Sequence, residues 1–384
     1  MPPKDFALAR ASTNEMTIVD NKPYLPKLFV TLESSNGDSG SLNGNNNDSS
    51  NIVDGSKTGT NISTHHSRTS ILSAVIAILF HDTAPPNDLE DSLKVKTVSG
   101  GNTNALYCIT GFNRIKTDYD SVLLRVFGAE GMIDRDVETC TFAKLSEAGI
   151  APSYHGRFGN GRVEGWLENF VPLVVMDFQI KSNMEAISRQ MARLHHGFRI
   201  PEELTEWHDR SNPGLWNQIF SWMEQAKKID PLNGYKSKGD SERAKRLLDI
   251  SLIEKELMWV KDSVVPPNSQ VAFCHNDLLP ANIMKHSETG EIRFIDFEYG
   301  GVNYVGFDLA NHFNEFAGGT EKKSGEPDYS LFPDESEQRL FIRAYVGECL
   351  SMISNTATTT TTAIKNEDED EEEEIQILLK EVHA

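Results

Sequence analysis

Apolar residues recur at helical spacing in several separate stretches of the chain, and short strand-like runs lie between the first two. Residues 71–80, ILSAVIAILF, form the longest apolar run and predict a buried helix that opens the folded part of the protein. Residues 134–149 begin with acidic residues, place apolar side chains at helical spacing and end at a glycine, which is typical of a capped helix. Between them, KVKTV, ALYCITGF and SVLLRVFG predict a β-meander with a glycine-rich first turn.

The second half of the chain is dominated by helical patterns. They begin near residue 185 with MEAISRQMARLHHG and continue through PGLWNQIFSWMEQAKK and SERAKRLLDISLIEKELMWVKD. Two strand-like stretches interrupt these helices, one before residue 275 and one before residue 296, and the SETGE turn between them predicts a β-hairpin. We therefore expect an α+β protein with a small β-rich part followed by a mainly helical part.

Two segments have compositions that do not favour a packed core. Residues 34–69 are almost all Ser, Asn, Gly, Asp and Thr, so we interpret 1–69 as a disordered extension and linker. Residues 356–374 combine a threonine run with eight consecutive acids, which predicts a solvated tail over 351–384. The folded protein is then expected to comprise an N-terminal lobe at 70–170 and a C-terminal lobe at 171–350.

The charge and the cysteine content of the sequence argue against several classes of protein. The formal net charge of −20 comes largely from the acidic tail and argues against a nucleic-acid partner. The four cysteines form no CxxC pair, so the sequence predicts neither a zinc site nor a disulfide framework. No apolar run is long enough for a membrane span, and the N-terminus has no signal-peptide core. A reducing, cytoplasmic location fits these features.

The stretch CHNDLLPANIM places a carboxylate, Asp277, five residues before an amide, Asn282, on a predicted loop. Magnesium is commonly held by one or two carboxylates together with other oxygens, phosphate oxygens among them. Asn282 and Asp296 can supply two such ligands if the hairpin brings Asp296 beside the loop. Asp277 then stays available to orient a substrate hydroxyl and accept its proton, as the loop aspartate of protein kinases does.

The remaining parts of a phosphoryl-transfer site are expected in the N-terminal lobe. The glycine pair Gly100 and Gly101 lets the backbone approach phosphates closely. Arg125, in the middle of a predicted strand, can reach the phosphates of a nucleotide, and Glu138 on the following helix can hold Arg125 in place. This order resembles the strand cation and helix glutamate of protein kinases, with arginine replacing lysine.

Three motifs together resemble the choline/ethanolamine kinase family: VSGGNTNALY, CHNDLLPANIM and IRFIDFEYGGVNYVGFDLANHFNEFAG. The resemblance covers roughly residues 70–348. It implies a protein-kinase-like two-lobed fold and transfer of a phosphate from ATP to an amino alcohol in the presence of Mg²⁺. HNDLL and NHFNEFAG resemble ethanolamine kinases more than choline kinases.

Carried onto this chain, the resemblance implies that Asp277 is the catalytic base and that Asn282 and Asp296 bind Mg²⁺. Residues 100–106 would cover the phosphates, and residues 165–169 would line the adenine slot. The nucleotide-binding residues are then Gly100, Gly101, Asn102, Thr103, Asn104, Arg125, Glu138, Gly165 and Leu167. The amino-alcohol end would comprise Glu298, Tyr299, Asp308 and Glu315. His275, His195, His196, His312 and Phe313 are expected to be structural.

The substrate prediction also has a chemical basis. A primary ammonium carries three hydrogen-bond donors and suits carboxylates, whereas a quaternary ammonium prefers aromatic faces. The sequence thus favours ethanolamine, converted to phosphoethanolamine for phosphatidylethanolamine synthesis by the CDP-ethanolamine route. It is silent on oligomeric state.

One departure from the family keeps alternatives open. Family members continue with helices whose tryptophans enclose the head group, but all five tryptophans here precede the catalytic loop. Either the chain is truncated relative to the family or its pocket is closed differently. The alternatives are a choline or dual-specificity kinase, another small-molecule phosphotransferase such as an aminoglycoside kinase, and an inactive binding or regulatory relative.

Overall fold

The computed structural model places the chain in two compact units. The first comprises Met1–Gly131 and Ser153–Trp166, and the second comprises Met132–Pro152 and Leu167–Ala384. Residues 132–152, which the sequence assigns to the N-terminal lobe, therefore pack with the second unit. The described residues are 17–18, 28–29, 66–81, 83–98, 104–114, 119–128, 134–228, 237, 239–240, 242–243, 249–319, 325–356 and 367–383.

The first unit is built on a five-stranded antiparallel sheet of order β3-β4-β5-β7-β6. Its strands are β3 (Lys94–Val98), β4 (Asn104–Thr110), β5 (Ser121–Phe127), β6 (Tyr154–Phe158) and β7 (Gly161–Gly165). The register pairs Arg125 of β5 with Leu106 of β4 on one side and with Arg162 of β7 on the other. The predicted meander over residues 93–127 is confirmed, while its glycine turn at 99–103 lies outside the described residues.

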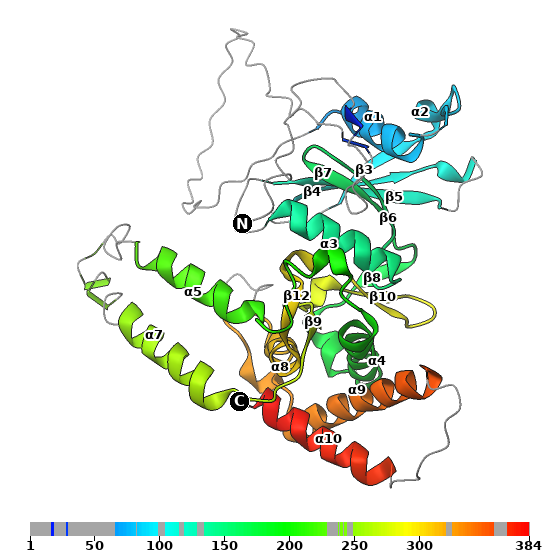
Figure 1. Ribbon diagram of the computed structural model, residues 1–384. Helices are drawn as coiled ribbons and strands as arrows, with labels where there is room; N and C mark the ends of the chain where they lie inside the picture. Colours follow the sequence, from blue (N-terminus) through cyan, green and yellow to red (C-terminus); the bar gives the residue numbers. More distant parts are fainter. Residues whose placement is uncertain are drawn as a thin grey trace, which may run out of the picture. The chain divides into compact units, whose positions relative to one another are not determined.

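Two helices accompany this sheet, α1 (Arg68–Leu79) and α2 (Leu89–Ser92) (Figure 1). The hydroxyl of Ser67 accepts a hydrogen bond from the N–H of Ser70 and caps α1, which begins at Arg68, shortly before the apolar run. α1 packs against β6, and its apolar side chains join those of β4, β5 and β7 in one core. The buried helix predicted from residues 71–80 is thus confirmed; its buried side chains are Ile71, Leu72, Ala74, Val75 and Ile78.

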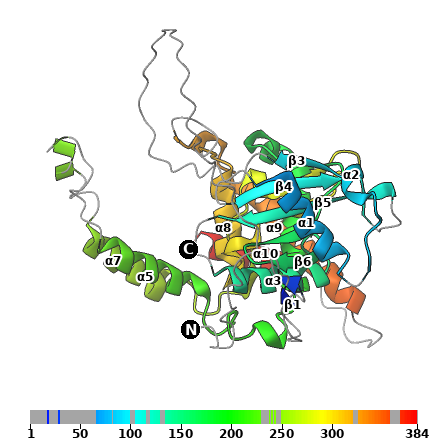
Figure 2. The same ribbon diagram turned by 90° about the horizontal axis from the view of Figure 1, so that it is seen from above.

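The second unit is mainly helical. Asp134 caps its first helix by accepting hydrogen bonds from the N–H groups of Asp136 and Val137, and Gly149 follows that helix with a φ of 72°. Figure 1 shows α5 and α7 side by side, and the two helices, which overlap in the view of Figure 2, contact each other. The helices are α3 (Arg135–Glu147), α4 (Lys181–Ala192), α5 (Gly214–Ala226), α7 (Ile250–Trp259), α8 (Val305–Glu315), α9 (Glu335–Thr356) and α10 (Glu367–Val382).

Short strands of the second unit support the predicted catalytic loop. β10 (Ile283–His286) pairs with β11 (Ile292–Phe294) and with β8 (Phe170–Pro172), so a hairpin across SETGE forms as predicted, but its first strand is β10 and not the run before residue 275. β9 (Val271–Cys274) pairs with β12 (Gly301–Tyr304). The chain therefore leaves β9, forms the loop 275–282 and returns along β10, which fixes both ends of the loop.

The acidic C-terminal segment differs from the solvated tail that its composition predicts. α9 extends through Thr356, and residues 367–382 form α10, which packs on α8 and α9. Ile375, Leu378 and Leu379 are buried there. The acids precede an apolar stripe at helical spacing, and burying that stripe stabilises the helix despite the charge repulsion.

The N-terminal extension lies mostly outside the described residues. Within residues 1–65 the structure describes two short paired strands, β1 (Thr17–Ile18) and β2 (Leu28–Phe29). Within the described part of the chain, no helix combines the length and apolar character needed to cross a membrane. Cys108, Cys140, Cys274 and Cys349 form no disulfide bond with one another.

Candidate active site

Asp277 and Asn282 face each other across the loop between β9 and β10. The side-chain amide nitrogen of Asn282 donates to Oδ2 of Asp277 at 3.1 Å and to the backbone carbonyl of Asp277 at 2.9 Å. These bonds use the amide N–H groups, so the carbonyl oxygen of Asn282 keeps its acceptor capacity for another group. Asn282 is buried and Asp277 is half-buried, so the loop is held in one arrangement.

Asp296 is brought to the same place by the hairpin. The N–H of Ile295, the residue before it, donates to the carbonyl of Asn282 at 3.0 Å. Asp296 itself has a left-handed backbone, with φ of 64° and ψ of 60°. Non-glycine residues in this region are uncommon and tend to cluster at functional sites. The expectation that the hairpin places Asp296 beside the loop is confirmed.

Four carboxylates gather around this point and alter one another's ionisation. Burial, together with the negative charges of Glu315, Asp296 and Glu298, raises the pKa of Asp277 to about 6. Burial and Asp296 likewise raise the pKa of Glu298. Tyr299, which is 40% exposed, has its pKa raised by burial and by the charges of Glu298, Asp277 and Asp296. A cation placed here would relieve this repulsion, so the residues fit a divalent metal ion.

Arg135 is a residue of this site that the sequence analysis missed. It is the first residue of α3, and its Nη1 lies 2.9 Å from Oε2 of Glu138 and 3.1 Å from Oε2 of Glu298. The arginine therefore ties the start of α3 to the acidic cluster and offsets part of its charge. Its position at a helix start, three residues before a glutamate, was the available signal.

Asn276 is a second missed residue, and it anchors the loop through four hydrogen bonds. Its N–H donates to Oδ1 of Asp308 at 2.7 Å, and its side-chain N–H donates to the carbonyl of Tyr299 at 2.9 Å. Its side-chain oxygen accepts from Asn303 at 2.7 Å, and its carbonyl accepts from Asn311 at 3.1 Å. Its φ is 65°, a left-handed conformation that asparagine tolerates better than most residues.

Asp308 is the clear correction to the predicted substrate residues. It is 0% exposed, and Oδ2 accepts from the N–H of His275 at 3.0 Å and lies 2.9 Å from Nε2 of His195. Burial alone would raise the pKa of Asp308, but the hydrogen bond and charge of His195 hold it below its ordinary value. Asp308 supports the loop from beneath, so the prediction that it contacts the amino alcohol is wrong.

His195, Cys274 and Asp308 place ligand atoms within 4.8 Å of one another, as a metal site would. Each atom already has a hydrogen-bond partner, however: Cys274 Sγ donates to backbone carbonyls such as that of Asn303, at 3.6 Å. Burial also raises the pKa of the Cys274 thiol well above its ordinary value, which keeps the proton on sulfur. The group is a hydrogen-bonded core. His275 and His312 are also buried, and one ring nitrogen of each is hydrogen-bonded to a backbone carbonyl. These contacts agree with the structural role that the sequence predicts for them.

In the first unit, Arg125 is buried in the middle of β5, and its Nε lies 2.8 Å from Oε1 of Glu164 on β7. Arg162 shares that carboxylate at 2.6 Å. Burial alone would raise the pKa of Glu164, but the two arginines hold it below its ordinary value. The sequence assigns this supporting role to Glu138, and the pairing of Glu138 with Arg125 stays a prediction.

The other predicted nucleotide-binding residues are placed individually. Gly100, Gly101, Asn102 and Thr103 lie outside the described residues. Asn104 begins β4, is buried and accepts a hydrogen bond from the N–H of Gly128 at 3.4 Å. Gly165 ends β7, and Leu167 follows in the second unit. Their contact with a nucleotide stays a prediction.

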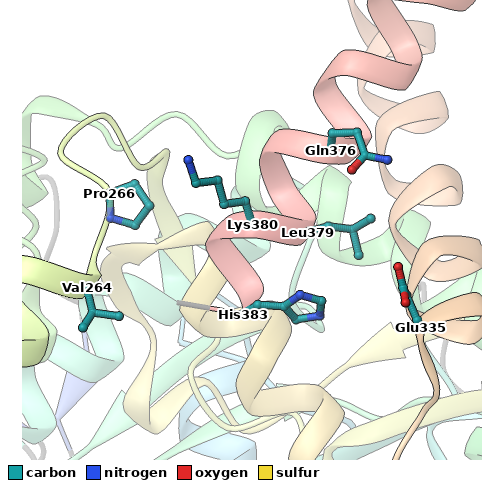
Figure 3. A pocket seen from close by; sticks show the side chains of 7 residues that line it. All are labelled: Val264, Pro266, Glu335, Gln376, Leu379, Lys380 and His383. Atoms are coloured by element: carbon teal, nitrogen blue, oxygen red, sulfur yellow. The ribbon is translucent and has the colours of Figure 1, made fainter.

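A separate surface cavity of about 470 Å³ lies in the second unit, at the end of α10 (Figure 3). The cavity contains none of the predicted site residues. It is lined by Val264, Pro266, Glu335, Gln376, Leu379, Lys380 and His383.

Comparison with known proteins matches residues 95–384 to the choline/ethanolamine kinase family model. The chain is 30% identical to probable ethanolamine kinase A of Dictyostelium discoideum, over 67% of this chain and 69% of that protein. It is 33% identical to ethanolamine kinase 1 of Mus musculus, over 64% and 63%. It is also 30% identical to probable choline kinase 2 of Arabidopsis thaliana, over 67% and 70%. The matched region thus spans roughly two thirds of these relatives.

Solved structures give the same fold. A choline kinase from Cryptosporidium parvum superposes with a TM-score of 0.62 at 23% identity, covering 82% of this chain and 87% of that one. An ethanolamine kinase from Plasmodium vivax superposes with a TM-score of 0.61 at 22% identity, covering 83% and 79%. These likenesses confirm the α+β, protein-kinase-like fold. The family match extends through α10, beyond the region that the motifs alone indicate, and the chain belongs to the choline/ethanolamine kinase family.

Proposed function

We propose that this chain is a magnesium-dependent kinase that transfers the γ-phosphate of ATP to the hydroxyl group of ethanolamine. The product, phosphoethanolamine, would enter phosphatidylethanolamine synthesis by the CDP-ethanolamine route. The observation that carries the proposal is the carboxylate cluster around Asp277, whose pKa of about 6 suits a base that works near neutral pH.

Asp277 is the proposed catalytic base. Its Oδ2 is fixed by the amide of Asn282, and its other carboxylate oxygen remains to accept the proton of the acceptor hydroxyl. Phosphoryl transfer needs little covalent chemistry from the protein, so orienting the hydroxyl toward the phosphate is the larger part of this residue's work.

Asn282 and Asp296 are the proposed magnesium ligands. The carbonyl oxygen of Asn282 has no role in the bond to Asp277, and Asp296 contributes charge to the same cluster. Bound there, magnesium would neutralise the charge of the ATP phosphates. Arg135, at the start of α3, already balances part of the negative charge of Glu298.

On the nucleotide side we propose Arg125 as the phosphate-binding cation. Glu164 would orient it through the 2.8 Å bond to Nε. Gly100, Gly101, Asn102, Thr103 and Asn104 are proposed to cover the phosphates. Glu138, Gly165 and Leu167 complete the proposed nucleotide-binding set.

Ethanolamine is the proposed acceptor because the described groups near Asp277 are mostly anionic. Glu315 and Glu298 both act on the pKa of Asp277, and a primary ammonium can donate hydrogen bonds to such carboxylates. Asp308 is left out of the substrate set, since all of its carboxylate is used inside the core.

Choline is the second candidate acceptor, for a specific reason. Tyr299 offers a partly exposed aromatic ring beside the carboxylates, and an aromatic face suits a quaternary ammonium. The relatives also include a probable choline kinase at 30% identity. The ratio of kcat/KM for the two amino alcohols distinguishes these readings.

The direct test is ADP formation by the purified full chain with ATP, MgCl₂ and either ethanolamine or choline. We expect magnesium-dependent turnover with ethanolamine as the preferred acceptor. Asp277→Ala should reduce kcat by roughly 10²-fold or more while ATP binding stays close to that of the parent protein. Glu291→Ala, which removes an exposed carboxylate from the neighbouring hairpin, is the matched control and should retain full activity.

The outcomes separate the alternatives. A higher kcat/KM for choline would overturn the acceptor assignment but keep the reaction class. No ADP formation with either amino alcohol would favour an inactive binding or regulatory relative. Normal kcat in Asp277→Ala would contradict the assigned base whichever acceptor is used.

A further inference from the structure

A buried chain of hydrogen bonds runs from helix α9 to the loop that carries Asp277. The hydroxyl of Tyr345 on α9 lies 2.9 Å from Nδ1 of His195 and 3.0 Å from Nε2 of His196. The opposite ring nitrogen of His195, Nε2, lies 2.9 Å from Oδ2 of Asp308. Tyr345 is 1% exposed, His195 2% and Asp308 0%, so water does not compete for these bonds.

The other end of this hydrogen-bond network lies at the loop. Oδ2 of Asp308 also accepts from the N–H of His275 at 3.0 Å, and Oδ1 accepts from the N–H of Asn276 at 2.7 Å. These are the two residues that precede Asp277 in the sequence. A carboxylate that accepts two successive backbone N–H groups fixes the direction of that backbone, and with it the side chain that follows.

One arrangement of protons satisfies every group in this hydrogen-bond network. Asp308 is ionised and only accepts, so Nε2 of His195 donates to it and Nδ1 accepts from the Tyr345 hydroxyl. The Tyr345 oxygen then accepts from Nε2 of His196. Burial lowers the pKa of His196 to about 4, which agrees with a neutral ring in this role. Each member therefore sets the orientation of the next.

The loop also needs such support. Asn276 has a φ of 65°, and a non-glycine residue keeps this left-handed conformation only when its surroundings hold it there. The bond from its N–H to Asp308, at 2.7 Å, is one of the two shortest of the four that hold this residue. Loosening Asp308 would thus free the backbone at the residue next to Asp277.

We propose, on the premise that the chain is the kinase described above, that Tyr345 and His195 are positioning residues for the transfer reaction. They hold the Asp308 carboxylate against the N–H groups of His275 and Asn276, and this contact sets the direction in which Asp277 faces the acceptor hydroxyl. The role of α9 therefore extends from packing to alignment of the catalytic base.

Tyr345→Phe is the sharpest test because it removes one hydroxyl and keeps the ring. We expect kcat to fall between about tenfold and a hundredfold, with KM for ATP and for the amino alcohol within about twofold of the parent values. His195→Gln keeps one donor and one acceptor and should retain more activity than His195→Leu, which keeps neither.

The matched control is Val346→Ala on the same helix. Val346 is 2% exposed, so its truncation weakens the packing of α9 without removing a polar contact. We expect this variant to lower the unfolding temperature at least as much as Tyr345→Phe does, with kcat unchanged. An equal loss of kcat in both variants would show a general stability effect and overturn the proposal.

Hydrogen–deuterium exchange gives a readout that does not depend on catalysis. The peptide that contains residues 275–277 should exchange faster in Tyr345→Phe than in the parent protein, and at the parent rate in Val346→Ala. Unchanged exchange in Tyr345→Phe would overturn the proposal whatever the kinetics. If the parent protein turns over neither amino alcohol, the proposed function fails, and this exchange comparison still decides whether Tyr345 holds the loop.

Discussion

The amide nitrogen of Asn282 lies 3.1 Å from Oδ2 of Asp277, so the proposed metal ligand also restrains the proposed base. One side chain thereby serves two neighbours: its N–H group donates to the carboxylate, and its carbonyl oxygen stays available for a cation. The five-residue spacing between the two residues follows from this geometry, because the turn through Pro280 must bring both side chains to the same side of the loop.

This double role predicts an unusual result for Asn282→Asp. The variant keeps an oxygen ligand but replaces the hydrogen-bond donor with a second carboxylate next to Asp277. We expect the pKa of Asp277 to rise further, because like charges at this distance disfavour ionisation of both groups. The kcat at pH 7 should fall by roughly 10²-fold, and part of the loss should be recovered at higher pH.

Asn282→Ala is the comparison for that experiment, since it removes both the donor and the oxygen. Measuring kcat against pH for both variants separates the two roles. If Asn282 acted solely as an oxygen ligand, Asn282→Asp would keep near-normal activity at pH 7, and that result would contradict the assigned restraint on Asp277.

Much of the scaffold follows from local patterns. The apolar run at 71–80, the capped helix from Asp134 and the hairpin across SETGE all form as predicted, because each is set by side-chain periodicity and turn residues within about fifteen positions. The acidic helix α10 was not predicted, because eight acids outweigh three buried apolar residues in any compositional measure.

The site was predictable only in part. The resemblance to the family assigned both Asp308 and Glu315 to the amino-alcohol end, and the two residues are seven apart on the same face of α8. They differ in depth: Asp308 is enclosed under the loop, whereas Glu315 lies where its charge acts on Asp277. Sequence spacing shows that two residues share a face of a helix, but whether each of them is buried depends on how the helix packs in the folded protein. The roles of Asn276 and Arg135 also depend on partners that lie far away in the sequence.

The bridge between Arg125, Glu164 and Arg162 predicts that Glu164→Gln affects nucleotide binding. The variant keeps the shape of the side chain but removes the charge that two buried arginines share. We expect KM for ATP to rise about tenfold with kcat less affected, because Arg125 loses its fixed direction toward the phosphates. Breaking a buried ion pair should also lower the stability of the first unit by about 3–5 kcal/mol.

Glu138→Gln is the companion variant. If Glu138 holds Arg125 as the sequence predicts, this variant should raise KM for ATP as well. If its main role is to hold Arg135 beside Glu298, KM for the amino alcohol should change instead. An unchanged KM for ATP in Glu164→Gln would contradict the role assigned to Glu164.

The packing of α10 on α8 predicts a large effect from the smallest possible substitution. A Cβ added to Gly306 would lie 2.8 Å from Cβ of Glu381 and 3.0 Å from its backbone carbonyl carbon. Gly306→Ala should therefore push α10 away from α8 and lower the free energy of unfolding by about 1–3 kcal/mol.

Gly347→Ala on α9 is the matched control, because a Cβ at that position meets nothing within 4 Å. It should stabilise the protein by about 0.5–1 kcal/mol, the usual gain from replacing a helical glycine. Urea unfolding curves of the two variants measure the difference. Equal midpoints would show that α10 does not pack against Gly306 in solution.

His208 predicts how stability depends on pH. Its ring is buried, Nε2 lies 2.8 Å from Oγ1 of Thr141, and burial lowers the pKa of His208 from 6.5 to about 4. Between these two values the unfolded chain binds a proton that the folded chain does not, so acidification favours unfolding. The stabilising contribution is complete above pH 6.5 and is lost as the pH falls toward 4.

His208→Gln keeps a hydrogen-bonding group near Thr141 but cannot titrate in this range. The free energy of unfolding of the parent protein should therefore fall between pH 7 and pH 5 by about 2 kcal/mol more than that of the variant. Burial lowers the pKa of His312 to about 4 as well, but His312 is present in both proteins, so its effect cancels in the comparison. Urea unfolding at the two pH values gives the four free energies required. The same loss of stability in both proteins would mean that His208 is already accessible to protons in the folded state.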